Sequence, residues 1–148
     1  MNTTYIAENA SQRERLVALT EKWTAADLAR EMPNGWSVAT KLAHLAFWDR
    51  YYLSLIDGWE RAGYQPETLE DGPINEAVRV MSRAIPPAAT VELVRAAAEA
   101  IDRRLETLSP ELEKVLEANG RVRLLRRALH RREHLDQIEE ALRGRDER

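Results

Sequence analysis

The chain contains no cysteine, which excludes disulfide bonds, thiolate metal ligands and an intrinsic cysteine nucleophile. Any thiol chemistry would therefore need a thiol from a co-substrate. The absence of cysteine also fits a reducing compartment, and we expect a cytoplasmic protein.

Long apolar runs are missing as well. No segment approaches the roughly 20 apolar residues that span a bilayer, and the stretch from Met1 to Leu16 lacks the apolar centre of a signal peptide. The formal net charge of -3 gives no surplus of positive charge for binding a nucleic acid. We expect a soluble protein with no membrane or nucleic-acid partner, whose partners are small-molecule substrates or other proteins.

Glycine is scarce, with six residues, and none of them forms a phosphate-binding loop or a dinucleotide fingerprint. The sequence also lacks a serine-histidine-aspartate set and a calcium loop, which disfavours the enzyme classes that depend on these motifs. The 148 residues, of which 44% are hydrophobic, suffice for one ordinary core. We expect a single domain over residues 1–148.

Helical periodicity dominates the sequence, and no segment shows the sustained alternation of a strand, so the predicted fold class is all-α. The pattern predicts four long amphipathic helices, bounded by capping residues and by glycine or proline. They are expected at 11–30 with a restart at Thr24, at 38–62, at 90–108 and at 121–143. Shorter helices are expected at 74–85 and between Ser109 and Asn119.

The connection from residue 63 to residue 89 is long, and Pro86 and Pro87 end it before the third long helix begins. A long crossover lets the second and third helices run in the same direction. The sequence therefore predicts a four-helix bundle with its crossover between helices 2 and 3.

The three histidines of the chain are the basis of the functional hypothesis. His130 and His134 are four residues apart in the last helix, where such side chains share one face and two imidazoles can bind one metal ion. His44 lies on the apolar side of the second helix. If these two helices are antiparallel, the three imidazoles lie at the same height along the helix axes and can bind one ion. Three ligands on one side of the ion leave a coordination position open, as in catalytic metal sites.

Other interpretations of the histidines stay open. His44 alone can be a core histidine that bonds a tyrosine, a carboxylate or a carbonyl, because an unsatisfied buried polar group costs about 1–3 kcal/mol. The pair can be two exposed or capping histidines placed by chance. Arg131 stands where the zinc proteases with a His-Glu-x-x-His motif have glutamate, so their chemistry is not supported.

Most charged residues near the histidines are predicted to lie on solvent-exposed faces of their helices. On the second helix, Asp49 and Arg50 lie opposite His44, and the arginines of the last helix are followed at once by acids, which predicts surface ion pairs. Arg123 and Arg127 share the flank of the histidine pair and could hold an anionic group of a substrate. Arg127, one turn before His130, could reach a carboxylate or phosphate, with Trp48 and Tyr51 lining the pocket on the other side. The arginines are Arg121, Arg123, Arg126, Arg127, Arg131 and Arg132.

Two stretches resemble the motifs of the DinB/YfiT-like superfamily. The first runs from Gly35 to Asp49 and reads GWSVATKLAHLAFWD, with tryptophan and serine followed by leucine-alanine-histidine-leucine. The second runs from His130 to Ile138 and reads HRREHLDQI, with two histidines four apart followed by glutamine and isoleucine. Their order and separation also fit, and the resemblance covers nearly the whole chain.

The resemblance implies an up-down-down-up four-helix bundle, often a homodimer, in which His44, His130 and His134 hold one divalent metal ion. Three neutral imidazoles suit zinc, nickel or iron, and also copper. Members of the superfamily include thiol-dependent transferases and isomerases, metal-dependent hydrolases and proteins of unknown activity, so no substrate follows from the resemblance. The residues from Leu124 to Leu129 depart from the family by lacking an aromatic or acidic residue, which concerns the pocket and not the ligands.

We expect a metal-dependent transferase, isomerase or hydrolase whose ion acts as a Lewis acid on water or on the thiol of a small cofactor. The alternative is a non-catalytic bundle that is stabilised by its metal and acts as a stress-response or binding module. A fourth protein ligand would favour the alternative, and an open cleft would favour the enzyme.

Overall fold

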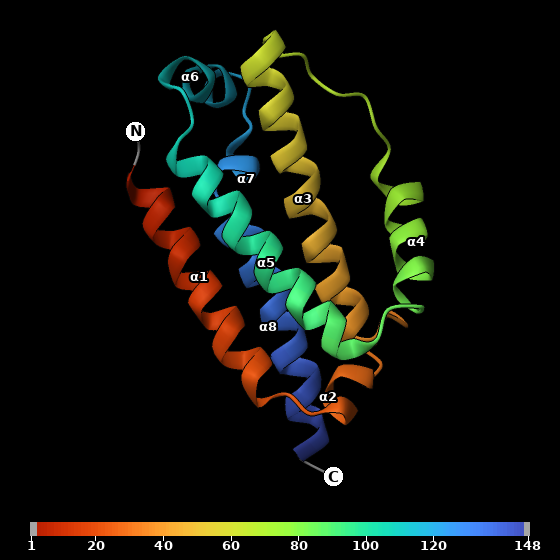
Figure 1. Cartoon of the computed structure of the whole chain (residues 1–148). Coiled ribbons are helices and arrows are strands. Elements are labelled where there is room, and N and C mark those ends of the chain that lie inside the picture. The colour runs from red at the N-terminus through yellow and green to blue at the C-terminus, as the bar shows by residue number, and fades with distance from the viewer. Residues whose placement is uncertain (1–2, 147–148) are drawn as a thin grey trace.

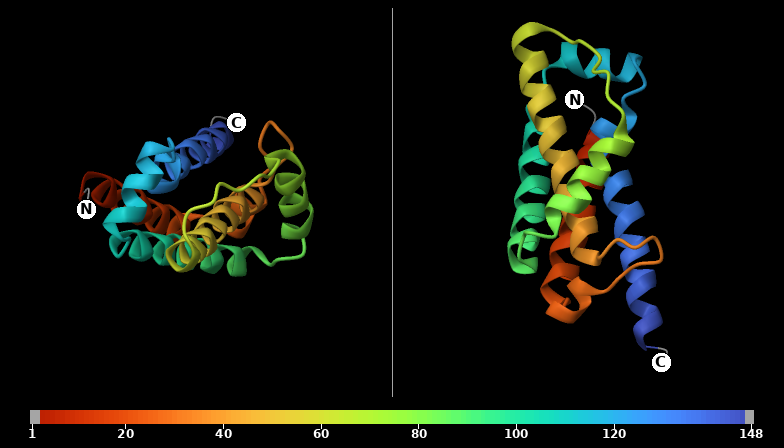
Figure 2. Two further views of the ribbon diagram at one scale, coloured as in Figure 1. Left: turned by 90° about the horizontal axis from the view of Figure 1, so that it is seen from above. Right: turned by 90° about the vertical axis from the view of Figure 1, so that its right-hand side faces the viewer.

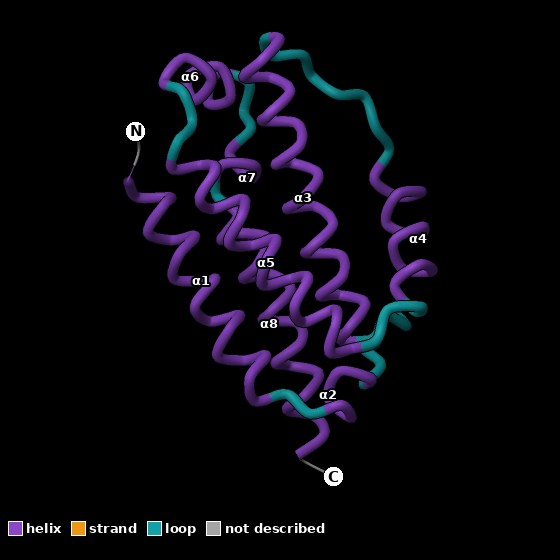
Figure 3. The backbone as a smooth tube through the Cα atoms, in the orientation of Figure 1, coloured by secondary structure: helices purple, strands orange, loops and turns teal. Residues whose placement is uncertain are grey.

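The computed structural model describes residues 3–146, and in this part of the chain helices are the regular elements, apart from one isolated β-bridge between Glu31 and Ser37 (Figure 3). The predicted all-α class is confirmed. Residues 1–2 and 147–148 of the expected domain lie outside the described residues. The described helices are α1 (Thr3–Lys22), α2 (Ala25–Ala29), α3 (Val38–Ala62), α4 (Asp71–Ser82), α5 (Pro87–Glu106), α6 (Pro110–Ala118), α7 (Val122–Leu125) and α8 (Arg127–Asp146).

The four long helices, α1, α3, α5 and α8, lie lengthwise side by side (Figure 1). α1 and α8 run in one direction, and α3 and α5 run in the other. α3 packs along α5, and α1 packs along both α5 and α8, whereas α3 and α8 touch over a shorter stretch. The looser seam is therefore the one between the two helices that carry the histidines.

Two helices, α2 and α3, begin at the capping residues from which the sequence predicts a helix start. Ser37 caps α3 by accepting a hydrogen bond of 3.0 Å from the Thr40 backbone N–H, and Thr24 caps α2 in a reciprocal pair with Asp27. α1 begins at Thr3, well before the predicted helix start at residue 11. Residues of its first turns are buried against other helices. Tertiary packing therefore stabilises helical structure before the position at which the local sequence predicts the helix to begin.

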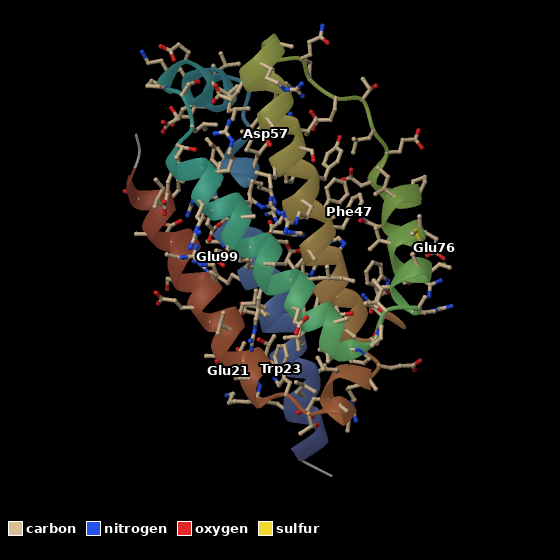
Figure 4. All side chains as sticks on the ribbon, in the orientation of Figure 1. Glu21, Trp23, Phe47, Asp57, Glu76 and Glu99 are labelled. Carbon is tan, nitrogen blue, oxygen red and sulfur yellow. The ribbon has the colours of Figure 1, made fainter. Side chains whose placement is uncertain are left out.

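The crossover between α3 and α5 carries α4, which packs on α3 outside the group of long helices (Figure 2). Phe47 of α3 faces α4 (Figure 4). Two hydrogen bonds attach α4 to α3: the Trp48 indole N–H donates to Asn75 at 2.8 Å, and the Ser82 hydroxyl donates to Thr40 at 3.1 Å. α4 thus has a fixed position beside the N-terminal half of α3.

The last long helix is interrupted, so the continuous helix predicted from 121 to 143 is wrong. Arg126 leaves the helical backbone conformation between α7 and α8. The buried side chain of Asn9 on α1 fills the break, donating to the Leu125 carbonyl at 2.9 Å and accepting from the Ala128 N–H at 2.8 Å. These bonds satisfy backbone groups that the break would otherwise leave unpaired, and such groups are costly when buried.

Four charged side chains, Asp49, Asp102, Arg127 and Arg131, form a buried charge network between the long helices. The predicted solvated faces are therefore wrong for Asp49 and Arg131. Arg127 Nε donates to Asp49 at 2.8 Å, and Arg131 donates in bidentate fashion to Asp102 at 2.8 and 2.9 Å. Arg131 also reaches the second oxygen of Asp49 at 3.4 Å. All four side chains are at most 4% exposed. The network therefore joins α3, α5 and α8, and Arg13 of α1 adds a further bond to Asp102.

The buried charge network separates two apolar clusters of the core. One cluster gathers around Leu16, Leu42 and Leu135, and the other around Ile56 and Leu105. In α3, Asp49 stands in the sequence between the residues of the two clusters, and in α5, Asp102 stands next to Ile101, where the two clusters meet. Arg127 and Arg131 stand between Leu125 of α7 and Leu135 of α8, which belong to different clusters. The core thus has a polar layer at mid-height.

We expect Arg131→Met to reduce the free energy of unfolding by about 3–5 kcal/mol, because it removes the bidentate partner of buried Asp102 and leaves two buried carboxylates, Asp49 and Asp102, with one arginine each. Urea denaturation measures the change. Arg103→Met is the matched control, since Arg103 is 75% exposed and pairs only with Glu99 on the same helix, and it should cost less than about 1 kcal/mol. Equal effects of the two substitutions would contradict the structural role of the network.

Candidate metal centre

The structure brings the three histidines together in the seam between α3 and α8. His44 comes from the second turn of α3, and His130 and His134 come from consecutive turns of α8. The Nε2 atoms of His44 and His130 are 3.1 Å apart, and the candidate ligand atoms of all three residues lie within 4.8 Å of one another. The convergence expected from the sequence spacing is present.

Hydrogen bonds of the second ring nitrogens orient two of the imidazoles. His134 Nδ1 is 2.9 Å from the Gln137 side-chain oxygen, so it carries the proton and leaves the Nε2 lone pair free. The Arg127 guanidinium, which can only donate, lies 2.9 Å from His130 Nδ1. Neutral His130 therefore carries its proton on Nε2, from where it points to His44.

A cavity of about 500 Å³ opens beside the three histidines. Trp48 and Arg127, two of the pocket candidates named from the sequence, line this cavity, whereas Tyr51 does not and Tyr52 stands in its place. The other lining residues are Asn34, Trp36, Lys41, Asp71, Asn75, Arg123 and Glu133. The histidines thus border a cavity large enough for a small molecule.

The sequence matches the DinB superfamily over residues 8–138, a stretch that includes all three histidines. The chain belongs to the DinB superfamily. Comparison with curated proteins and with solved structures gives no match to this chain. None of the described helices combines the length and the apolar character that a membrane span requires.

Burial keeps the imidazoles of this DinB protein neutral. It lowers the pKa of His44 to about 3, with further lowering by the neighbouring His134 and by the charge of Lys41. Burial also lowers the pKa of His130, helped by the guanidinium of Arg127, and the pKa of His134. Neutral imidazole is the form that binds a metal ion, and at neutral pH His134 has its Nε2 lone pair free, whereas His130 carries a proton on Nε2.

The donor set of this DinB protein fits a divalent metal ion. Two nitrogens at about 2.0–2.1 Å from a tetrahedral ion are about 3.3 Å apart, close to the 3.1 Å between His44 and His130. His44 Nδ1 is buried without a hydrogen-bond partner, and Gln137 supports His134 as carboxylates and amides support zinc-bound histidines. For His130 to bind a metal ion through Nε2 as a neutral imidazole, its proton would have to move to Nδ1, where it would replace the hydrogen bond from Arg127.

Two features of the site were not found in the sequence. Arg127, expected to hold a substrate anion, lies within the buried charge network, and its guanidinium bonds Asp49, His130 and the Arg123 carbonyl. Lys41 was not considered, although it stands one helical turn before His44 on the same side of α3. The three-residue spacing between Lys41 and His44 is the signal that could have found it.

The lowered pKa values predict that the metal-free protein loses stability as the pH falls from about 6.5 towards about 3. Between these pH values the histidines are protonated in the unfolded chain and neutral in the folded protein. Each such histidine therefore lowers the free energy of unfolding by up to about 1.4 kcal/mol per pH unit as the pH falls. Chemical denaturation at several pH values in the presence of a chelator measures the slope. His44→Gln should make the slope shallower, and an unchanged slope would contradict the burial argument.

Proposed function

We propose that this DinB protein is a metal-dependent enzyme, a transferase, isomerase or hydrolase, that uses one divalent ion held by His44, His130 and His134. Such an ion supplies Lewis acidity, which lowers the pKa of a bound water or of a small thiol co-substrate. Zinc, nickel and iron suit the three imidazoles. The substrate is a small molecule that occupies the cavity beside the histidines.

The observation that carries this proposal is the convergence of three neutral imidazoles at the wall of an open cavity. Among the described residues, the candidate metal-binding group contains these three histidines and no fourth side chain. Asp71 and Glu133 line the cavity without joining the group, and Glu133 pairs with Arg123 at 2.9 Å. Three ligands next to a cavity leave a coordination position open, as in catalytic sites.

The residues around the histidines perform the positioning that such a site needs. Gln137 fixes the ring of His134, and Arg127, itself fixed by Asp49, fixes the ring of His130. The Trp36 ring packs edge-on against His44, with ring centroids 5.6 Å apart, and restricts its rotation. The imidazoles are thus oriented in advance, which lowers the entropic cost of binding an ion.

The expected up-down-down-up four-helix bundle and the homodimer are part of the proposal. The directions of the four long helices in Figure 1 support the bundle topology. Support for a dimer comes from Met81 and Leu93, apolar side chains that are exposed beside an apolar cavity between α3, α4 and α5. The non-catalytic alternative, a metal-stabilised bundle that acts as a stress-response or binding module, would close the open coordination position with a fourth ligand.

Protein purified without an affinity tag should carry about one divalent ion per chain, and His134→Ala should remove most of it, because two imidazoles bind far more weakly than three. Elemental analysis of both proteins measures the metal content. Glu140→Ala is the control, since its side chain lies exposed on the same helix, 77% accessible, and it should keep the metal. Full metal retention by His134→Ala would refute the proposed ligand set.

The open position should be visible after cobalt substitution. Small thiols or azide should change the visible absorption spectrum of the cobalt protein, because they can enter the first coordination sphere through the cavity. A spectrum that no added thiol or anion changes would favour the non-catalytic alternative over the enzyme.

A further inference from the structure

Lys41 lies in the wall of the same cavity as the histidines, although its side chain is almost removed from solvent. It is 7% exposed and belongs to the first turn of α3, one turn before His44. Its ammonium group lies over the Trp36 ring, 4.7 Å from the ring centroid. A buried lysine of this kind normally has an acidic partner, because an unpaired buried charge is costly.

No carboxylate of the described residues forms an ion pair with Lys41. The acid that faces it is Glu133, but this side chain pairs with Arg123. Asp71 lines the cavity without pairing with the lysine. Burial lowers the pKa of Lys41, and the charge of Glu133 offsets only part of this effect. The N-terminal end of α3, which carries a partial positive charge, further disfavours a cation there.

The other cations that line the cavity already have partners. Arg127 is bonded to Asp49 in the buried charge network, and Arg123 is paired with Glu133. Among the described lining residues, Lys41 is therefore the cation whose charge no carboxylate balances. An anion in the cavity would supply the missing partner.

Two amide groups in the cavity wall add hydrogen-bond donors. The Asn75 side-chain oxygen accepts from the Trp48 indole, and the Asn34 side-chain oxygen accepts from the Trp36 backbone N–H. These bonds orient both amides and leave their NH₂ groups for other acceptors. The wall thus combines an unbalanced cation with oriented neutral donors, which suits an oxyanion.

We propose that Lys41 binds the oxyanion of the substrate, a carboxylate or a phosphate, and so identifies the substrate of the proposed enzyme as a small anionic molecule. This inference rests on the proposed function, because it takes the bound anion to be the substrate of that enzyme. Binding of the anion itself does not require the metal. One helical turn between Lys41 and His44 places the anionic group close to the histidine site, so the reacting atom is a few bonds from the oxyanion. The size of the cavity, about 500 Å³, sets the upper limit for the molecule.

The experiment measures anion binding to chelator-treated protein by tryptophan fluorescence, since Trp36 lies beneath the ammonium group of Lys41. Inorganic phosphate and acetate are titrated separately, at an ionic strength held constant with chloride. The two arms distinguish a phosphate from a carboxylate. Lys41→Met should raise the dissociation constant of the preferred anion at least about tenfold, because it removes a charge-assisted hydrogen bond.

Lys114→Met is the matched control, because it makes the same substitution and the same change in net charge at an exposed residue of α6. It should leave anion binding unchanged. Equal binding by the wild type and by Lys41→Met would overturn the inference, and so would a wild type that binds neither phosphate nor acetate.

A second measurement keeps the test decisive if Lys41→Met does not fold. Reductive methylation with ¹³C-formaldehyde labels the three lysines of the chain and keeps their charge. Phosphate or acetate should shift the NMR signal of Lys41 and leave those of Lys22 and Lys114 in place. A Lys41 signal that neither anion shifts would overturn the inference. Metal content is measured on the same preparation before the chelator is added, so protein that binds the anion through Lys41 but is purified without metal would refute the proposed function alone.

Discussion

The buried charge network of Arg127, Arg131, Asp49 and Asp102 is the constraint on which the rest of the structure depends. It lies between the two apolar clusters and, with Arg13, joins all four long helices. Burying these charges is costly, and well-packed apolar residues would often stabilise a core as much. Each charge is balanced only when the helices have this register, however. We infer that the network selects one register among those that apolar packing alone would allow.

The metal centre depends on this register through a single side chain. Arg127 bonds Asp49 of α3 and also donates to His130, so the contact that aligns α3 with α8 also orients a ligand. Asp49 follows His44 along α3, while Arg127 precedes His130 along α8. Because the two helices are antiparallel, the register that places Asp49 opposite Arg127 also places His44 opposite His130. Correct pairing in the polar layer therefore brings the histidines together. The site lies between α3 and α8, which pack over a shorter stretch than α3 with α5 or α1 with α8, and the buried ion pair of Asp49 with Arg127 joins these two helices.

Much of this arrangement could be predicted from local signals in the sequence. The helix expected at 90–108 has apolar residues at alternating three- and four-residue spacing, which predicts a buried face. Five of the six are buried and Val91 is half-buried; the five are Val94, Ala98, Ile101, Leu105 and Leu108. The four-residue spacing of His130 and His134 predicted that they share a face, and they do.

The rest of the arrangement depends on pairing across the chain. Asp49 looks solvated on its own helix, and it is buried because Arg127 reaches it from 78 residues away. The interruption at Arg126 is equally invisible locally, since it is Asn9 of α1 that satisfies the backbone there. The apolar periodicity of a single helix does not reveal a partner that lies on another helix far away in the sequence.

The charges around the cavity connect the proposed metal to the proposed anion. Arg127 and Arg123 each pair with an acid and the histidines are neutral, so among the described lining residues Lys41 is the cation that no carboxylate contacts, although Asp71 lies in the same cavity wall. A divalent ion at the histidines would add positive charge to the cavity, and an oxyanion at Lys41 would add negative charge. Each ligand therefore lowers the electrostatic cost of binding the other, and by thermodynamic linkage the two affinities must rise by the same factor. A cavity of this kind favours the metal most when the anionic substrate is present.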